Sequence, residues 1–370
     1  MDRLRGLIMV LMAIDHASFF VAGRHPAEFW GYPLPTYGAA AVPFLTRELT
    51  HLAAPGFFFL LGVGVVLLAE ARRAAGWSEG RVLRFLMLRG AVLLAAQQLI
   101  ENPAWLLGQT FKVAGDTSPV PGTPTAVWLH FGVLAALGVA LVTAGLATRL
   151  PRWVAGLLGV AMIGLTIAVT PGATQVLEAA PAWQRLLLLP GRTGMLQVYY
   201  PFVPWCGVAL LGVAYGQRLA RDREAALRGA AWGALALLAL FAAARSSGFG
   251  ALHGVEHPGW IGVLSVTKYP PDLPFLALTL GVDLGLLALL ARLPALRPLR
   301  WLEVFGATAL FFYLAHLYLY FLIGVPFRGG TGYGGLYLGW GAGLVILFPL
   351  CARYLAFKRT TTPDSLWRLL

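Results

Sequence analysis

Stretches of about twenty mostly apolar residues recur along the whole 370-residue chain, and each is long enough to cross a lipid bilayer as a helix. Charged residues make up only 12% of the sequence, about half of the roughly 25% that is usual in soluble domains. The chain also lacks the charge blocks and short repeats of disordered or fibrous proteins. The sequence therefore predicts an all-α fold, a polytopic transmembrane helix bundle that forms a single domain over residues 1–370.

We predict about ten spans from these stretches. They lie near residues 4–22, 52–70, 83–102, 125–147, 152–171, 198–217, 227–244, 272–292, 302–324 and 335–354. Small-residue runs within them, such as Gly212-x-x-x-Gly216, are typical of closely packed membrane helices.

The basic residues alternate between the two sides of this predicted bundle. If the N-terminus is cytoplasmic, 19 Lys and Arg residues fall in inner segments and 8 in outer ones, which is the positive-inside bias of membrane proteins. We therefore expect both termini to be cytoplasmic, in a multi-pass protein of a cytoplasmic membrane in contact with lipids. The same bias explains the net charge of +12 without a nucleic-acid partner.

The first predicted span carries ionisable residues at two depths. Arg5 and His16 are eleven residues apart, which on a helix is three turns plus about 20°, so they share one face about 16 Å apart along the axis. Met9 and Met12 lie between them on this face. A cation at the inner membrane edge is thus aligned with a titratable base further out, as an elongated anionic donor would require. Ionisable residues inside a span, here Asp15 and His16, are costly and are usually functional.

All seven histidines fall in the outer half of a predicted span or in an outer loop; they are His16, His25, His51, His130, His253, His257 and His316. Histidine is the side chain best suited to acid–base chemistry near neutral pH. Asp15 is not expected to orient His16, because adjacent residues on a helix point about 100° apart. Asp15 must hold another partner, or the helix must break there.

Other chemistry has less support in the sequence. Arg89 lies within the third span on its inner side, where it could meet a donor phosphate, and Glu101 ends that span on the outer side. The chain has no H-E-x-x-H metal motif and no glycine-rich phosphate loop, so we expect no metal.

Five segments, taken in order, resemble a known family. They are Asp2-x-x-Arg5-Gly6 followed by Asp15-His16; Phe44-Leu45-Thr46-Arg47-x-x-x-His51-x-x-Ala54-Pro55-x-Phe57-Phe58-Phe59-Leu60-x-Gly62; Tyr200-Pro201-x-x-Pro204-Trp205-x-Gly207; Lys268-Tyr269-Pro270-Pro271; and Phe312-Tyr313-x-x-His316. Together they resemble the heparan-alpha-glucosaminide N-acetyltransferase-like family of bacterial membrane proteins. The ten residues between Arg5 and His16 also resemble the Arg-x10-His pattern of the related acyltransferase family 3, in which that pair is held to be essential.

The resemblance implies a transmembrane acyltransferase that takes an acyl group, most simply acetyl, from cytoplasmic acetyl-CoA or another acyl-CoA. The acceptor would be sugar-like, a glycan or amino sugar on the outer side. Arg5 and Arg89 would bind the CoA phosphates, and Arg47, His51 and His316 would bind the acceptor or orient the base. In the lysosomal relatives Asn takes the place of His16, and a histidine of the first outer loop, near the place of His25, is held to be catalytic. The catalytic group therefore comprises His16, His25 and Asp15, with either histidine as the base.

The alternative to an acyltransferase is a proton-coupled transporter of a small solute that uses the same intramembrane His, Asp and Arg residues. The chain has no internal repeat, and its histidines gather on one side instead of extending through the bilayer; both features argue against transport. The sequence is compatible both with direct transfer of the acyl group and with a covalent acyl-enzyme intermediate. It is also compatible with a homodimer.

The charge bias generates a topology prediction. In intact cells, a cysteine introduced by Ser78→Cys should be shielded from a membrane-impermeant thiol reagent, whereas one introduced by Ser118→Cys should react. The unaltered chain, with Cys206 and Cys351 in apolar stretches, provides the background. Labelling at position 78 but not at 118 would reverse the orientation.

Overall fold

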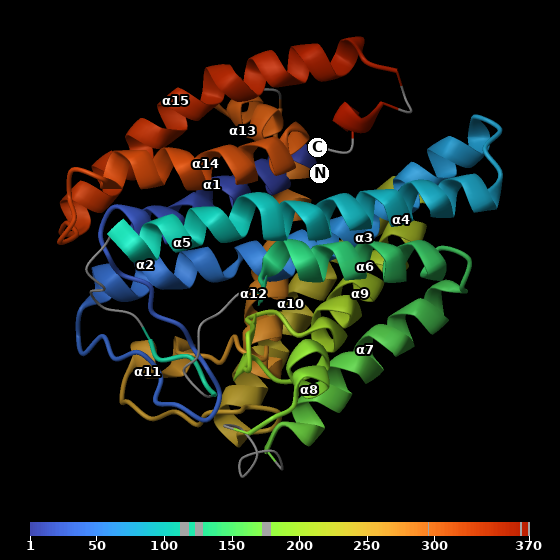
Figure 1. The fold of residues 1–370 in the computed structure, drawn as a ribbon. Coiled ribbons are helices and arrows are strands. Elements are labelled where there is room, and N and C mark those ends of the chain that lie inside the picture. The colour runs from blue at the N-terminus through green and yellow to red at the C-terminus, as the bar shows by residue number, and fades with distance from the viewer. Residues whose placement is uncertain (112–117, 123–128, 172–178, 295, 363–364, 369–370) are drawn as a thin grey trace.

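The computed structural model describes residues 1–111, 118–122, 129–171, 179–294, 296–362 and 365–368. The chain is 73% helical, and its long helices lie against one another (Figure 1). The α-helices are α1 (Asp2–Phe20), α2 (Ala41–His51), α3 (Ala53–Ala74), α4 (Glu79–Ala96), α5 (Asn102–Phe111), α6 (Val133–Ala147), α7 (Arg152–Val169), α8 (Ala182–Leu187), α9 (Phe202–Arg221), α10 (Arg223–Ser247), α11 (Trp260–Leu264), α12 (Leu273–Arg292), α13 (Arg297–Ala307), α14 (Ala309–Gly324) and α15 (Tyr333–Thr360). A π-helical turn, η1 (Gln97–Glu101), joins α4 to α5.

Each of the ten predicted ranges falls on one or more of these helices, although residues 125–128 of the fourth lie outside the described residues. Within the described part of the chain, six helical segments are long and apolar enough to cross a membrane. They are Ala41–Ala74, Glu79–Phe111, Arg152–Val169, Arg223–Ser247, Leu273–Arg292 and Tyr333–Thr360. The bundle is therefore that of a polytopic membrane protein.

The range 302–324, which we predicted as one span, is instead two helices. α13 and α14 meet at 94° beside Thr308. α13 folds back onto α1, where Gly306 faces the backbone of Asp2 and Gly6 faces the backbone of Leu302 so closely that neither position has room for a Cβ atom. Hydropathy does not reveal the bend, because the end of α13 and the whole of α14 together still pass as one apolar stretch.

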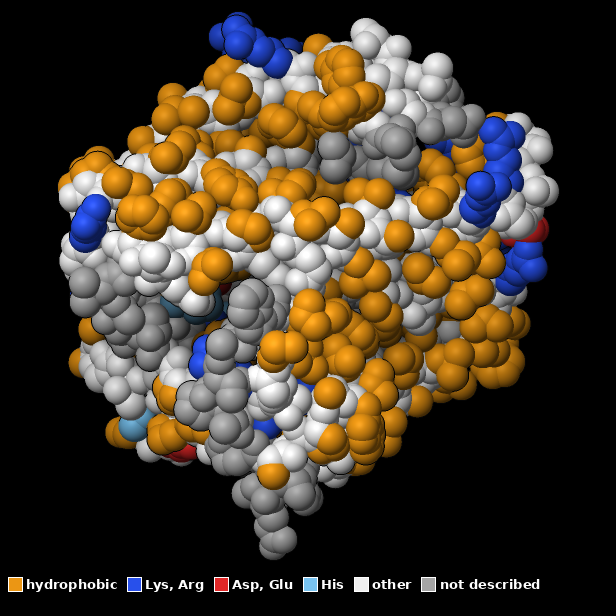
Figure 2. Space-filling model, viewed as in Figure 1, with side chains coloured by type: hydrophobic (Ala, Val, Ile, Leu, Met, Phe, Trp, Pro, Cys, Tyr) orange, Lys and Arg blue, Asp and Glu red, His pale blue; other side chains and the backbone are white. Residues whose placement is uncertain are grey.

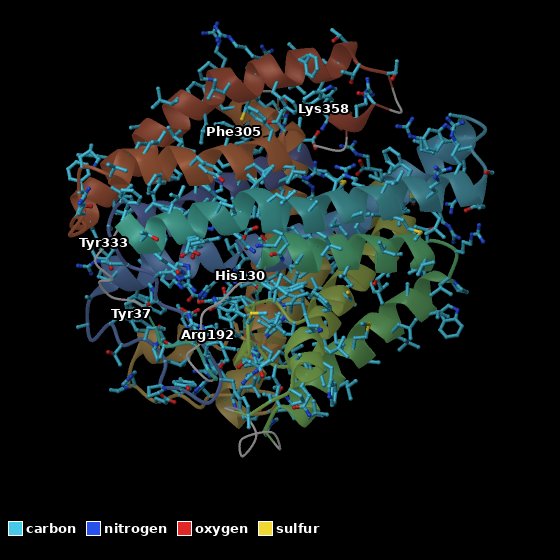
Figure 3. All side chains as sticks on the ribbon, viewed as in Figure 1. Tyr37, His130, Arg192, Phe305, Tyr333 and Lys358 are labelled. Carbon is cyan, nitrogen blue, oxygen red and sulfur yellow. The ribbon has the colours of Figure 1, made fainter. Side chains whose placement is uncertain are left out.

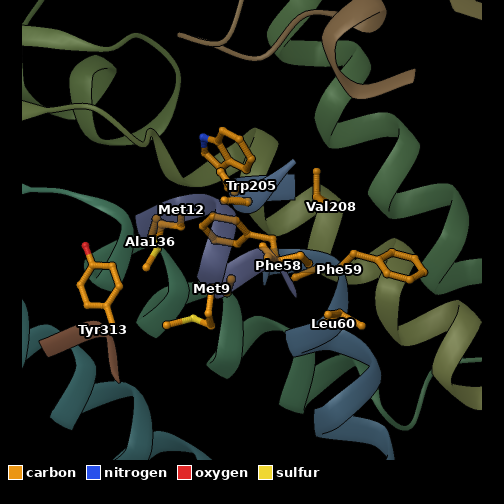
Figure 4. Packing of buried hydrophobic residues seen from close by; sticks show 14 of the residues in the cluster. Met9, Met12, Phe58, Phe59, Leu60, Ala136, Trp205, Val208 and Tyr313 are labelled. Atoms are coloured by element: carbon orange, nitrogen blue, oxygen red, sulfur yellow. The ribbon is translucent and has the colours of Figure 1, made fainter. Parts of the chain in front are cut away.

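Glycines also bring α3 and α9 together. Gly212 lies against the Phe59 carbonyl, Gly62 lies against the Ala209 carbonyl, and Gly216 packs on Val63. This confirms the close packing predicted for the small-residue run of α9. Around this crossing, Phe58 and Trp205 stack in the hydrophobic core (Figure 4).

A small sheet interrupts the helices, so the predicted all-α fold is nearly but not wholly correct. Strands β1 (Leu129–Phe131), β2 (Gly191–Thr193) and β3 (Leu196–Val198) lie in the order β1-β3-β2. β3 pairs with β1 in parallel and with β2 in antiparallel fashion. Strands of three residues are too short to produce a readable alternation of polar and apolar residues.

Hydrophobic side chains spread over the face of the bundle in Figure 2, and Lys and Arg gather at the edge where α3 turns into α4. The exposed arginines of this region are Arg81, Arg84, Arg149 and Arg152. Glu79 pairs with Arg73 at 2.6 Å and with Arg149 at 3.1 Å. These pairs hold the α3–α4 and α6–α7 turns at the same end of the bundle, as the predicted alternation of loops requires.

The α3–α9 crossing generates a stability prediction. Gly62→Ala places a Cβ atom against the Ala209 backbone, which cannot move aside as a flexible side chain could. The expected loss of stability is about 1–3 kcal/mol, the cost of overpacking a core, seen as a lower midpoint of thermal unfolding. Gly164→Ala on α7 is the matched control, because nothing lies within 4 Å of its added Cβ. Equal midpoints for the two variants would refute the close crossing.

Candidate active site

Asp15 and His16, near the C-terminal end of α1, line a cavity of about 740 Å³. Its wall includes three histidines, His16, His25 and His130, and we call it the histidine cavity. α1 supplies the first histidine, the loop after α1 the second and β1 the third. The cavity thus brings together residues that the sequence separates by more than a hundred positions.

His16 is held by a second buried histidine, His316 of α14. Nδ1 of His16 is in hydrogen-bond contact with Nε2 of His316, and Nδ1 of His316 lies 3.0 Å from the Phe312 carbonyl. A carbonyl can only accept, so His316 donates from Nδ1 and accepts at Nε2, and His16 donates from Nδ1. This assigns the neutral tautomer of His16 with an unprotonated Nε2. No described residue hydrogen bonds that atom, and the ring lines the cavity.

Asp15 has a partner other than His16, one of the two outcomes expected from the helix geometry. Its Oδ1 accepts from Nη1 of Arg47 at 2.6 Å, and its Oδ2 lies 3.9 Å from Nε2 of His25. Arg47 also forms a bidentate salt bridge with Glu28, to which its Nε and Nη2 each donate a hydrogen bond of 2.8 Å. On the far side of Glu28, a ring nitrogen of His51 lies 3.1 Å from Oε2. One buried charge cluster therefore joins α1, α2 and the loop between them.

Burial and neighbouring charges set the protonation states of the loop residues in and around this cluster. Burial opposes ionisation of Glu28, but the Arg47 guanidinium and His51 hold its pKa well below the usual range. Burial lowers the pKa of His25, although Asp15 opposes the shift. Burial, with repulsion from Arg47, also lowers the pKa of Lys268, to about 8. At neutral pH Glu28 is thus a carboxylate and His25 an uncharged imidazole.

Backbone hydrogen bonds hold in place the loop that carries His25 and Glu28. Lys268 and Tyr269 donate their backbone N–H groups to the Glu28 carbonyl, and Trp30 donates to the Tyr269 carbonyl at 2.8 Å. Tyr269, which precedes a cis proline, stacks on Phe29. The Lys268-Tyr269-Pro270-Pro271 segment is therefore hydrogen bonded to the loop between α1 and α2 and holds it in place.

A second cavity, of about 290 Å³, is lined by Arg5, Arg89 and Lys358, from α1, α4 and α15. Apart from these cations its wall is almost wholly apolar and includes Met9, and no described carboxylate lines it. We call it the basic cavity. Three like charges around one cavity repel one another unless an anion neutralises them, so its chemistry suits an anionic ligand with an apolar portion.

The two cavities meet at Tyr313 and Val133, which line both. The ring of Tyr313 lies 5.9 Å from that of His16, centre to centre. In Figure 3 Lys358 lies toward one end of this path, with His130 and Arg192 toward the other, and Figure 4 shows Tyr313 beside the core residues Met9 and Met12. The arrangement therefore connects a basic compartment to a histidine compartment through the interior of the bundle.

The structure separates the predicted residues into three groups. His16, Asp15 and His25 line the histidine cavity, and Arg5 and Arg89 line the basic cavity. Arg47, His51 and His316 line neither cavity; they are buried behind the histidine cavity, against Asp15, Glu28 and His16.

Sequence reasoning missed several residues of the histidine cavity. Its wall includes the aromatic side chains Trp105, Tyr199, Tyr200 and Tyr269 and the sheet residues Arg192 and Gln197. It also includes Glu101, which we placed at the end of the third span without assigning it a role. Its carboxylate accepts from Trp105 at 3.2 Å, and it lies on η1, a type of helix irregularity that is frequent at functional sites. Tyr200 and Tyr269 each precede a proline, and this pattern was a sequence signal for part of the wall. Nothing in the sequence indicated the sheet.

Comparison with protein families adds one finding. The family model described as "Heparan-alpha-glucosaminide N-acetyltransferase, catalytic" matches residues 1–247, which reach from α1 to the end of α10. No curated protein sequence matches the chain. The matched region includes His16, His25, Arg5 and Arg89, whereas Tyr313, His316 and Lys358 lie beyond it.

Proposed function

Because the chain belongs to the heparan-alpha-glucosaminide N-acetyltransferase catalytic family, we propose that it is a membrane acetyltransferase that uses cytoplasmic acetyl-CoA and a sugar-like acceptor on the outer side. The observation that carries this proposal is the meeting of the basic and histidine cavities at Tyr313. A donor held in one compartment and an acceptor held in the other could react there without either crossing the membrane. The family assignment does not favour the transporter alternative.

In the proposed complex the basic cavity holds the donor. Arg5, Arg89 and Lys358 bind the CoA phosphates, since guanidinium and ammonium groups form strong charge-assisted hydrogen bonds with phosphate. Arg5 is already oriented by bonds to the Gly306 carbonyl at 3.0 Å and to Asp2 at 3.2 Å. The apolar wall takes the uncharged arm of CoA and directs the thioester toward Tyr313.

The histidine cavity holds the acceptor, and His16 is the base. Its unprotonated Nε2 accepts the proton as the acceptor amine or hydroxyl attacks the thioester carbonyl. A new C–N or C–O bond forms and the C–S bond breaks. The CoA thiolate then leaves and takes the proton from the His16 imidazolium. The Tyr313 hydroxyl is placed to donate a hydrogen bond to the oxyanion that forms during this step.

The residues buried behind the cavity act as positioning groups in this scheme. His316 fixes the tautomer of His16, as the third member of a catalytic triad fixes its histidine. Arg47 and His51 hold Asp15 and Glu28, and Asp15 faces His25. Of the two roles that we expected for Arg47, His51 and His316, binding the acceptor or orienting the base, this scheme assigns them the second.

The donor site predicts a binding defect. Arg5→Ala removes a cation from the basic cavity, so the dissociation constant of acetyl-CoA should rise about ten-fold or more, because a hydrogen bond to a charged group contributes about 1.5–3 kcal/mol. Calorimetry on the purified protein measures it. Arg84→Ala is the control, since Arg84 is exposed on α4 and does not line the cavity. Unchanged acetyl-CoA affinity in Arg5→Ala would exclude Arg5 from the donor site.

The proposed base predicts a kinetic defect. His16→Ala should lower kcat for acetyl transfer by about 10²–10⁴, while acetyl-CoA binding changes only a few fold, because His16 contacts the reacting centre and not the phosphates. Activity of the wild type should fall once the pH is low enough to protonate the base. His257→Ala, at an exposed outer-loop histidine, is the control.

His25→Ala separates the two candidate bases. An inactive His25→Ala enzyme beside a nearly normal His16→Ala enzyme would move the base to the outer loop. If both variants keep full activity, neither histidine is the base.

A further inference from the structure

α13 differs from the long helices because it lies across the bundle and not along it. α14 runs beside α1, from the contact of His316 with His16 to Gly324, which packs against the Phe20 backbone. α13 makes an angle of 94° with α14, so it also crosses α1, where Gly6 packs closely against the α13 backbone. α13 therefore lies in the plane of the membrane at the surface where α1 begins, which the charge bias predicts to be cytoplasmic.

The two faces of α13 differ in polarity. Leu302 and Gly306 are four residues apart and pack against α1. At 100° per residue, Arg297, Arg300 and Trp301 lie on the opposite face, and all three side chains are exposed. Arginine together with tryptophan on the outward face of such a helix is typical of helices that lie among the headgroups of a bilayer.

The arginines around the turn from α12 to α13 have no described counter-charge. Arg292, the last residue of α12, is exposed like Arg297 and Arg300, and none of the three forms a described ion pair or hydrogen bond. Glu303, the one acid of α13, pairs with Arg3 at 2.7 Å. Basic residues at a membrane surface attract anionic headgroups, and each adds to the affinity.

We propose that Arg292, Arg297 and Arg300 form a binding site for the phosphate headgroup of an anionic phospholipid. Guanidinium groups bind phosphate oxygens through paired N–H donors. The exposed apolar side chains of Leu296 and Trp301 lie beside these arginines, which favours a lipid over a soluble phosphate, because they can contact the glycerol backbone and the first acyl carbons. This site goes beyond the proposed function and does not depend on it.

The same helix reaches the basic cavity. Nη1 of Arg5 donates to the Gly306 carbonyl at 3.0 Å, and Gly306 lines that cavity. Gly306 cannot move further toward α1, because it already packs against the Asp2 carbonyl. A headgroup that holds Arg297 and Arg300 at the membrane surface therefore also holds the carbonyl that orients Arg5. This link to donor binding rests on the proposed function.

Lipid binding without acetyl-CoA tests the site. The purified full-length protein in a neutral detergent is titrated with phosphatidylglycerol or with phosphatidylcholine of the same acyl chains, and native mass spectrometry measures binding of the first lipid. Phosphatidylglycerol should bind about ten-fold or more tightly, and Arg297→Gln/Arg300→Gln should reduce this preference to within about two-fold. Arg84→Gln/Arg152→Gln, which removes two exposed arginines from the same predicted surface, should keep it.

Four results would overturn the site. The first is equal affinity of the wild type for the two lipids, and the second is a preference that survives in Arg297→Gln/Arg300→Gln. The third is an equal loss in both double variants, which would assign the lipid to the basic surface as a whole. The fourth is binding of free glycerol 1-phosphate as tight as that of phosphatidylglycerol, which would indicate a soluble ligand. If Arg297→Gln/Arg300→Gln does not fold, Arg292→Gln decides, since a reduced preference supports the site and an unchanged one contradicts it.

Acetyl-CoA binding in nanodiscs that contain phosphatidylglycerol tests the link to the donor site separately. The dissociation constant should be about five-fold or more higher for Arg297→Gln/Arg300→Gln than for Arg84→Gln/Arg152→Gln, which loses the same charge. Equal constants would refute the link and leave the lipid site. Failure of the wild type to bind acetyl-CoA would refute the proposed function, and the lipid preference would still decide the site.

Discussion

Arg47 holds two carboxylates, Asp15 and Glu28, inside the protein through three charge-assisted hydrogen bonds. Buried charges are tolerated only when they are paired with good geometry, and removing one partner leaves the others uncompensated. Because Asp15 is on α1, Glu28 on the loop between α1 and α2, and Arg47 on α2, this interaction fixes the loop against the two helices. The placement of His25 beside Asp15, and the shape of the histidine cavity, depend on it.

Because Arg47 pairs with Asp15 and Glu28, the other polar groups of the two cavities are not needed to compensate these carboxylates. Asp15 is neutralised by Arg47 and so does not compete for the donors on the cavity wall, and His16 is oriented from behind by His316. On the other side of Tyr313, three cations face a cavity without a described carboxylate. One compartment therefore presents an imidazole nitrogen that no described residue hydrogen bonds and the other presents a cluster of cations, and α1 supplies residues to both.

The sequence predicted the helices far better than it predicted the site. Hydropathy located each apolar segment, because burial in lipid demands about twenty apolar residues whatever their neighbours. It did not show the bend beside Thr308, before which α13 packs against α1 through close glycine contacts, because these contacts join segments about 300 residues apart. Spacing along α1 drew attention to Arg5 and His16, which line the two cavities, but the contact of His16 with His316 joins residues 300 positions apart, which no local pattern encodes. The sheet that carries Arg192 was missed because its strands have only three residues each.

Transfer between compartments is best tested with the protein in sealed proteoliposomes that hold an amino-sugar acceptor inside and receive labelled acetyl-CoA outside. Molecules whose basic cavity faces outward should acetylate the enclosed acceptor while the CoA formed stays outside, and the His16→Ala protein should not. Product that forms only when acceptor and acetyl-CoA are on the same side of the membrane would contradict a reaction centre reached from both faces.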